Sequence, residues 1–90
     1  MQTINNIISQ WHYIEQNYEY GCLTITTNNH IFMIDNKNEQ KYLYLTINDV
    51  VYQYTHIEAI INDYYELFQS NVVIIHTTPN KRKRKRSIDD

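Results

Sequence analysis

The chain has 90 residues, of which 42% are hydrophobic and nine are tyrosines, and its formal net charge is −2. A chain of this length forms one domain and buries roughly 60 to 65% of the surface that its unfolded form exposes, so this composition excludes a wholly disordered protein. The charges are segregated: eight acidic residues and two lysines, a net charge of −6, precede Lys81, whereas Lys81 to Arg86 are all basic. Such segregation bears on partners and localisation.

The composition also indicates a source and a compartment. Asn, Ile and Tyr are abundant, whereas Ala59, Gly21 and Pro79 are each the only residue of their type, a skew expected of an A/T-rich coding sequence. We expect a DNA virus as the source, with an A/T-rich eukaryote as the alternative. The single Cys22 cannot form an internal disulfide, and neither a signal peptide nor an apolar run of about 18 residues is apparent, so we expect a soluble, intracellular protein with no membrane contact.

Helical spacing of apolar residues marks the first element. The pattern predicts a helix from about Thr3 to Glu19, and Gly21 then suits a left-handed residue that ends it. The apolar stripe consists of Ile4, Ile7, Ile8, Trp11, Ile14 and Tyr18.

Two hairpins are predicted next, because the apolar period changes to two. Asn28-Asn29 is a two-residue turn that places Leu23 opposite Ile34 and Ile25 opposite Phe32. Asn48-Asp49 offers a second turn of the same length. The pairs that it predicts are Ile47 with Val50, Leu45 with Tyr52 and Leu43 with Tyr54.

The last elements are a helix and a strand. Thr55 and Glu58 have the spacing of a capping box, which predicts a helix from there to Ser70. Val72 to Ile75 is an unbroken β-branched run, typical of a strand covered on both faces. Pro79 and the threonines before it are expected to end this strand.

These elements predict an α+β fold of order α-β-β-β-β-α-β. The economical assembly is a mostly antiparallel sheet with both helices packed on one face. We expect residues 1–78 to form the globular domain and residues 79–90 to form a disordered basic tail.

No motif for catalysis or for a cofactor is apparent. Phosphate-binding loops and nucleophile elbows need several glycines, and the chain has one. His56 and Glu58 are better explained by capping than by acid-base chemistry. The sequence therefore predicts a protein that is not an enzyme and that holds no cofactor. A zinc site is also not expected, because no compact ligand spacing joins Cys22, His12, His30, His56 and His76.

Three hypotheses explain the many tyrosines. They are good strand formers, they can stack on nucleic-acid bases, and they suit protein contacts because they give a large area with few rotors to freeze. Base stacking is disfavoured because the acidic region before Lys81 repels phosphates. The tyrosines concerned are Tyr42, Tyr44, Tyr52, Tyr54, Tyr64 and Tyr65.

The basic run is typical of a nuclear localisation signal, which predicts a nuclear protein that binds an import receptor. Two alternatives remain: phosphate contacts to nucleic acid, and a merely solubilising charge run. Ser87 lies three residues after Arg84, a spacing that makes it a candidate phosphorylation site beside the run. The residues of the run are Lys81, Arg82, Lys83, Arg84, Lys85 and Arg86.

These observations predict a small, non-enzymatic nuclear accessory protein that acts by protein contact, in the host nucleus if it is viral. The alternative is a nucleic-acid-binding protein that uses the tail for phosphate contacts. The acidic region also suits a basic protein partner. A candidate interface, which could form a homodimer, lies on the sheet face opposite the helices. Its residues are Ile31, Met33, Tyr42, Tyr44 and Val51.

Overall fold

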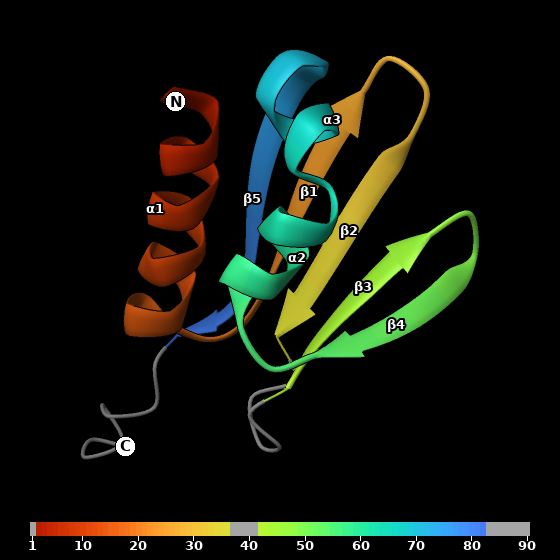
Figure 1. Cartoon of the computed structure of the whole chain (residues 1–90). Coiled ribbons are helices and arrows are strands. Elements are labelled where there is room, and N and C mark those ends of the chain that lie inside the picture. Colours follow the sequence, from red (N-terminus) through yellow and green to blue (C-terminus); the bar gives the residue numbers. More distant parts are fainter. Residues whose placement is uncertain (1, 37–41, 83–90) are drawn as a thin grey trace, which may run out of the picture.

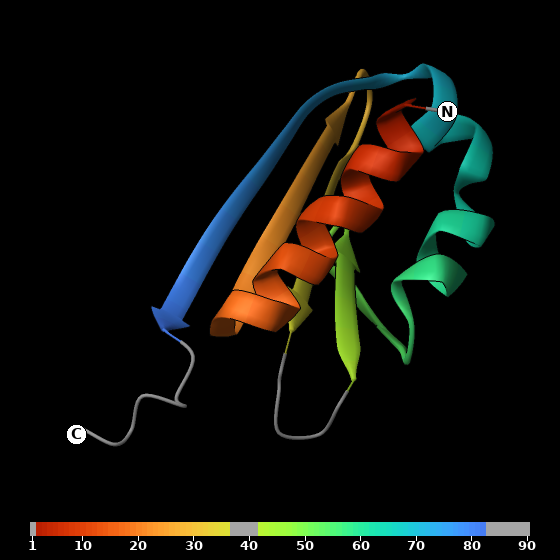
Figure 2. The same cartoon turned by 90° about the vertical axis from the view of Figure 1, so that its left-hand side faces the viewer.

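The computed structural model describes residues 2–36 and 42–82. Five strands form one antiparallel sheet in the order β4-β3-β2-β1-β5, and all three described helices lie on one of its faces (Figures 1 and 2). The predicted α+β class is confirmed. The elements are α1 (Gln2–Asn17), β1 (Tyr18–Thr27), β2 (Ile31–Asn36), β3 (Leu43–Ile47), β4 (Val50–Tyr54), α2 (Ile57–Asp63), α3 (Tyr65–Ser70) and β5 (Val72–Arg82).

The core fills the layer between the helices and the sheet. Trp11 of α1, Phe32 of β2 and Phe68 of α3 are its largest fully buried side chains. The rings of Phe32 and Phe68 meet edge to face with their centroids 4.9 Å apart, a preferred geometry for aromatic pairs. Alternate residues of the central strands, such as Leu23 and Ile34, complete this layer because successive strand side chains point to opposite faces.

The first helix ends earlier than its apolar pattern predicts. Helix α1 ends at Asn17 and β1 begins at Tyr18, so the expected end at Glu19 is wrong. Gly21 lies inside β1 without a positive φ and does not cap the helix. A Cβ atom at Gly21 would lie 2.5 Å from Cγ2 of Ile14, closer than packed carbon atoms approach. Glycine is therefore required at this position because α1 packs closely on the strand.

Both predicted hairpin registers are confirmed. Leu23 pairs with Ile34 in the first hairpin, and Leu45 pairs with Tyr52 in the second. In the second turn Asn48 and Asp49 have φ values of 52° and 65°, and they are the only non-glycine residues with positive φ in the described parts of the chain. The first turn, Asn28-Asn29, also has two residues, but neither of them has a positive φ.

The second predicted helix differs in its start and in its continuity. His56 is the N-cap of α2 and makes no side-chain capping bond, so the expected capping box of Thr55 and Glu58 is wrong. The helix is interrupted at Tyr64, whose φ of −121° and ψ of 30° leave the helical region. Two short helices therefore replace the single one, although the expected end at Ser70 is confirmed.

Strand β5 is an edge strand, and the expectation of a strand covered on both faces is wrong. It pairs only with β1 among the described strands, and Val73 and Ile74 are 60% and 55% exposed. Its backbone also continues past Pro79 to Arg82, so Pro79 does not end it. Proline has no backbone N–H to give, and an edge strand tolerates this loss.

Candidate interaction surface

The sheet face opposite the helices is uncovered by any described element (Figure 2). We call it the open face, and it carries the outward side chains of all five strands. Met33 of β2 pairs with Thr46 of β3, which in turn pairs with Val51 of β4, so these three form one row across the sheet. Ile31, Met33 and Val51 are all exposed. The structure therefore brings these predicted interface residues together.

The two tyrosines of the predicted interface lie at the other end of the open face. Tyr44 pairs with Asp35 on one side and with Gln53 on the other. Tyr42 precedes β3, and the two rings meet edge to face with centroids 6.5 Å apart. Both tyrosines are half-buried, whereas Met33 and Val51 are exposed.

Ile74 of β5 is an exposed apolar residue of the open face that the sequence did not predict. It pairs with Thr26 of β1, whose own partner on β2 is Ile31, so these residues form a second row beside that of Met33. The open apolar area therefore extends to the β5 edge of the sheet. Pro79 was the sequence signal that could have identified β5 as an edge strand and Ile74 as exposed.

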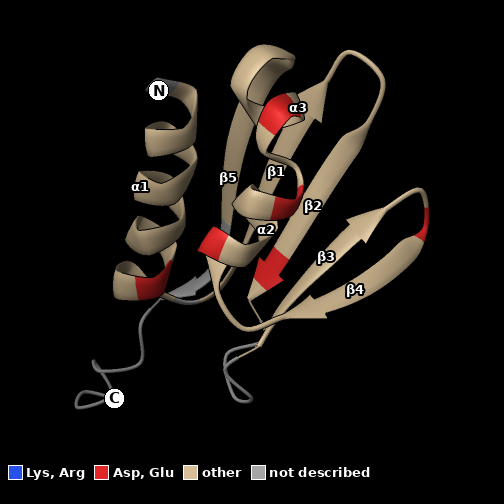
Figure 3. Cartoon of the chain, in the orientation of Figure 1, with Lys and Arg blue, Asp and Glu red and all other residues tan. Residues whose placement is uncertain are grey.

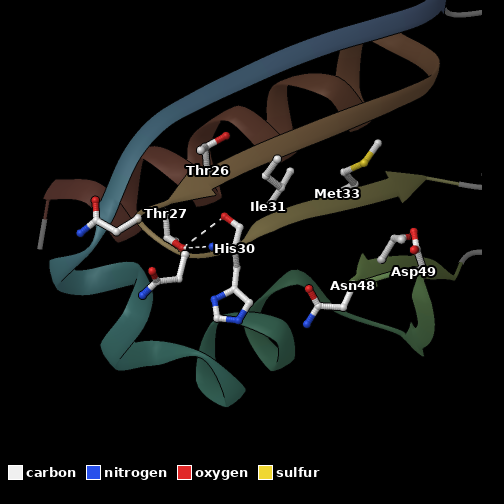
Figure 4. Close-up of a pocket in the computed structure, with 10 residues that line it drawn as sticks. Thr26, Thr27, His30, Ile31, Met33, Asn48 and Asp49 are labelled. Carbon is white, nitrogen blue, oxygen red and sulfur yellow. Dashed lines mark hydrogen bonds between the residues drawn. The ribbon is translucent and has the colours of Figure 1, made fainter.

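A shallow hollow of about 570 Å³ lies at the turn end of the open face (Figure 4). Both turns contribute to its wall, with Ile31 and Met33 beside Asn48 and Asp49. His30 donates its backbone N–H to Thr27 Oγ1 over 3.0 Å and packs its ring against Phe32. The lining offers apolar groups together with amide and hydroxyl groups.

Cys22 lies on the open face next to Asp35, with which it pairs across β1 and β2. Burial raises the pKa of the Cys22 thiol, and the nearby Asp35 carboxylate raises it further. A thiol with a raised pKa forms little of the thiolate that acts as a nucleophile. Cys22 is therefore a half-buried structural residue.

On the helix side, a polar cluster ties β4 to the helices. The Tyr54 hydroxyl donates a hydrogen bond of 2.7 Å to Asp63 Oδ2 at the end of α2. Burial raises the pKa of Tyr54, and the bond to Asp63 raises it further, because both favour the neutral hydroxyl. Burial likewise raises the pKa of Tyr64. Both hydroxyls stay protonated at neutral pH, so the cluster has a structural character.

The described side chains include six acidic residues. Within residues 2–36 and 42–82 the described side chains include no Lys or Arg (Figure 3). His12 lies between two carboxylates, with Nδ1 3.0 Å from Glu15 and Nε2 4.0 Å from Glu58. Glu58 therefore faces α1 and takes no part in the predicted capping box. The acidic residues are Glu15, Asp35, Asp49, Glu58, Asp63 and Glu66.

The histidines and Cys22 are spread over separate elements. No three His, Cys, Asp or Glu side chains gather as a metal ion would require in the described part of the chain. Nor does any described helix have the length and apolar character needed to cross a membrane.

The basic run lies mostly outside the described residues. The backbones of Lys81 and Arg82 belong to β5, where they pair with Tyr20 and Tyr18 of β1. Residues 83–90 are not described, so Lys83 to Arg86 and the candidate phosphorylation site Ser87 have no assigned position. Strand β5 includes the backbone of residues 79–82, which the sequence analysis assigned to the basic tail.

Comparisons with known proteins give no relative: no family model, no curated protein and no solved structure matches this chain.

Proposed function

We propose that this protein is a small, non-enzymatic nuclear accessory protein that acts by protein contact through its open face. The open face supports the proposal, because exposed apolar side chains from three strands, β2, β4 and β5, lie on one uncovered surface. Contiguous exposed apolar area of this kind usually marks an interface. If the source is a DNA virus, the compartment is the host nucleus.

The nuclear part of the proposal rests on the basic run Lys81–Arg86. An import receptor recognises five to eight basic residues in an accessible chain. In this protein the run is the only concentration of positive charge in an otherwise acidic sequence. Contacts to nucleic acid are the competing role, but the acidic described surface opposes the approach of phosphates.

The import function is tested in cells with the full chain fused to a fluorescent protein. The wild type should accumulate in the nucleus, and the triple variant Lys83→Gln, Arg84→Gln, Lys85→Gln should distribute evenly. The peptide Thr77–Asp90 fused alone serves as the second test, because it should carry the reporter into the nucleus without the folded domain. An even distribution of both wild-type fusions contradicts the import proposal.

The open-face function is tested by retention of partners from nuclear extract. Val51→Glu and Tyr44→Glu each place a charge in the proposed contact, and an unpaired charge buried in an interface costs several kcal/mol. Both variants should lose the proteins that the wild type retains, whereas Tyr65→Glu, an exposed position on α3, should keep them. Retention of the same proteins by all four chains contradicts the role of the open face.

A further inference from the structure

Strand β5 offers an unpaired edge. It is the last strand of the sheet on one side, and no described strand pairs with its outer edge. Figure 2 looks onto this edge, and no described helix crosses it; α1 lies beside β5 on the covered face. An edge strand presents a row of unpaired backbone N–H and C=O groups that can pair with another chain.

The part of β5 between Val72 and Thr78 lacks most of the features that protect edge strands. It contains neither a lysine nor an acidic residue, and Val73 and Ile74 are among the most exposed large hydrophobic residues of the protein. The register shift between Thr26 and Thr27 leaves Val73 as an extra residue, while Ile74 to Thr78 stay in regular register with β1. Proline and basic residues, which protect an edge, come only after this stretch.

The opposite edge of the sheet is a poorer template. Strand β4 has five residues, and β5 has eleven. Short edge strands are one of the ways in which proteins avoid pairing. The contrast points to β5 as the edge that another chain adds to.

A second copy of this chain fits the β5 edge by symmetry. Two antiparallel copies of one strand pair about a two-fold axis, so each copy supplies the same edge and no other sequence is needed. The pairing keeps Ile74 and His76 of both copies on the open face and Ile75 of both copies on the covered face. All helices then remain on one side of a continuous sheet.

Charge on the neighbouring helix does not oppose a second copy. Helix α1 borders the edge, contains neither Lys nor Arg and has a single acid, Glu15, so little repulsion arises from this helix.

We propose that two copies of this chain join antiparallel through β5 into one ten-stranded sheet, which leaves the open face of each copy free. The dimer does not depend on the proposed nuclear function, since the two use different surfaces. A result that contradicts the dimer would not contradict the nuclear function, and the reverse also holds.

Sedimentation equilibrium of the full chain tests the proposal with two matched variants. Val73→Lys and Val51→Lys replace side chains of equal exposure, 60% each, on the β5 edge and on the open face respectively. The wild type should form dimers, and Val51→Lys should dimerise equally well. Val73→Lys should weaken the dimer by at least about tenfold, because the two-fold axis places the new charge in the contact twice.

Three results overturn the proposal: a wild type that stays monomeric at the highest attainable concentration, a dimer that Val51→Lys disrupts while Val73→Lys does not, and a dimer that neither variant affects.

If Val73→Lys fails to fold, amide hydrogen exchange of the wild type decides whether β5 is the dimer contact. Amides of Val72–Thr78 should gain protection as the protein concentration rises, whereas those of β4 should not. Equal protection of β5 at all concentrations contradicts the proposal.

Discussion

The two edges of the sheet are held in different ways. Strand β4 is joined to β3 by a two-residue turn and to the following helix by the bond between Tyr54 and Asp63, nine residues apart. Strand β5 pairs with β1, about fifty residues earlier in the chain, and Thr77 donates a hydrogen bond to the Gln10 side chain of α1. One edge therefore rests on contacts between neighbours in the sequence, and the other rests on long-range contacts.

This difference predicts how the two edges respond to mutation. Changes near β4 remove local contacts, so they should alter stability by small amounts. The β5 edge requires α1, β1 and β5 to fit together at once, so a change at their junction should have a larger effect.

Gly21→Ala should have the largest effect, at the junction of α1, β1 and β5. Gly21 pairs with Pro79 of β5, and its added Cβ would lie 2.5 Å from Cγ2 of Ile14. Overpacking of a well-packed core typically costs about 1 to 3 kcal/mol, so we expect a loss of about 2 kcal/mol in the free energy of unfolding. Urea denaturation followed by circular dichroism measures it.

A double-mutant cycle controls for other effects of this substitution. Ile14→Ala removes the atoms that the new Cβ would meet, at the cost of a cavity. The double variant should therefore lose less stability than the sum of the two single losses. Additive losses would show that the contact between Gly21 and Ile14 does not determine the glycine.

Tyr54→Phe should have an intermediate effect on the β4 edge. The substitution removes the hydrogen bond to Asp63, which is worth about 1 kcal/mol. Tyr13→Phe is the matched control, because Tyr13 is exposed and its hydroxyl has no hydrogen-bond partner among the described residues. Thermal unfolding at neutral pH should distinguish the two variants, and equal stability of both would contradict the role of the bond.

The same tyrosine predicts a pH dependence. Its pKa is raised in the folded state above the ordinary value of 10.0, so folding favours the neutral hydroxyl. The stability that this group contributes is fully present below pH 10 and is lost as the pH rises through the folded pKa. Tyr54→Phe should therefore lose less stability between neutral pH and pH 11 than the wild type does, and an identical loss in the two proteins argues against this linkage.

Glycine substitutions in the two turns should have the smallest effects, and of opposite sign. Asp49 has a φ of 65°, a left-handed conformation that glycine adopts without steric strain. Asp49→Gly should therefore stabilise the protein by about 0.5 kcal/mol. Asn29 does not have a positive φ, so Asn29→Gly should destabilise it by a similar amount because the unfolded chain gains freedom. Chemical denaturation of the two variants side by side measures both, and changes of the same sign would contradict the assignment of the turns.

Much of the sheet could be predicted because its signals are local. Leu23 opposite Ile34 and Leu45 opposite Tyr52 follow from alternation and from a two-residue turn, which together leave one register with an apolar face. The exposure of Ile31, Met33 and Val51 on the open face followed from the same alternation, since they point away from the core. Ile74 was missed because a β-branched run fits a central strand and an edge strand equally well.

The sequence by itself determined the α+β class, the two hairpin registers and the separation of an acidic domain from a basic run, because periodicity, turn residues and charge act over a few neighbouring positions. Only the tertiary structure decided that β5 lies at an edge, that Gly21 serves the close approach of α1, and that the helix breaks at Tyr64. These features depend on which elements meet in space. Packing and steric fit between residues far apart in the chain decide which elements meet, and no local sequence pattern encodes these contacts.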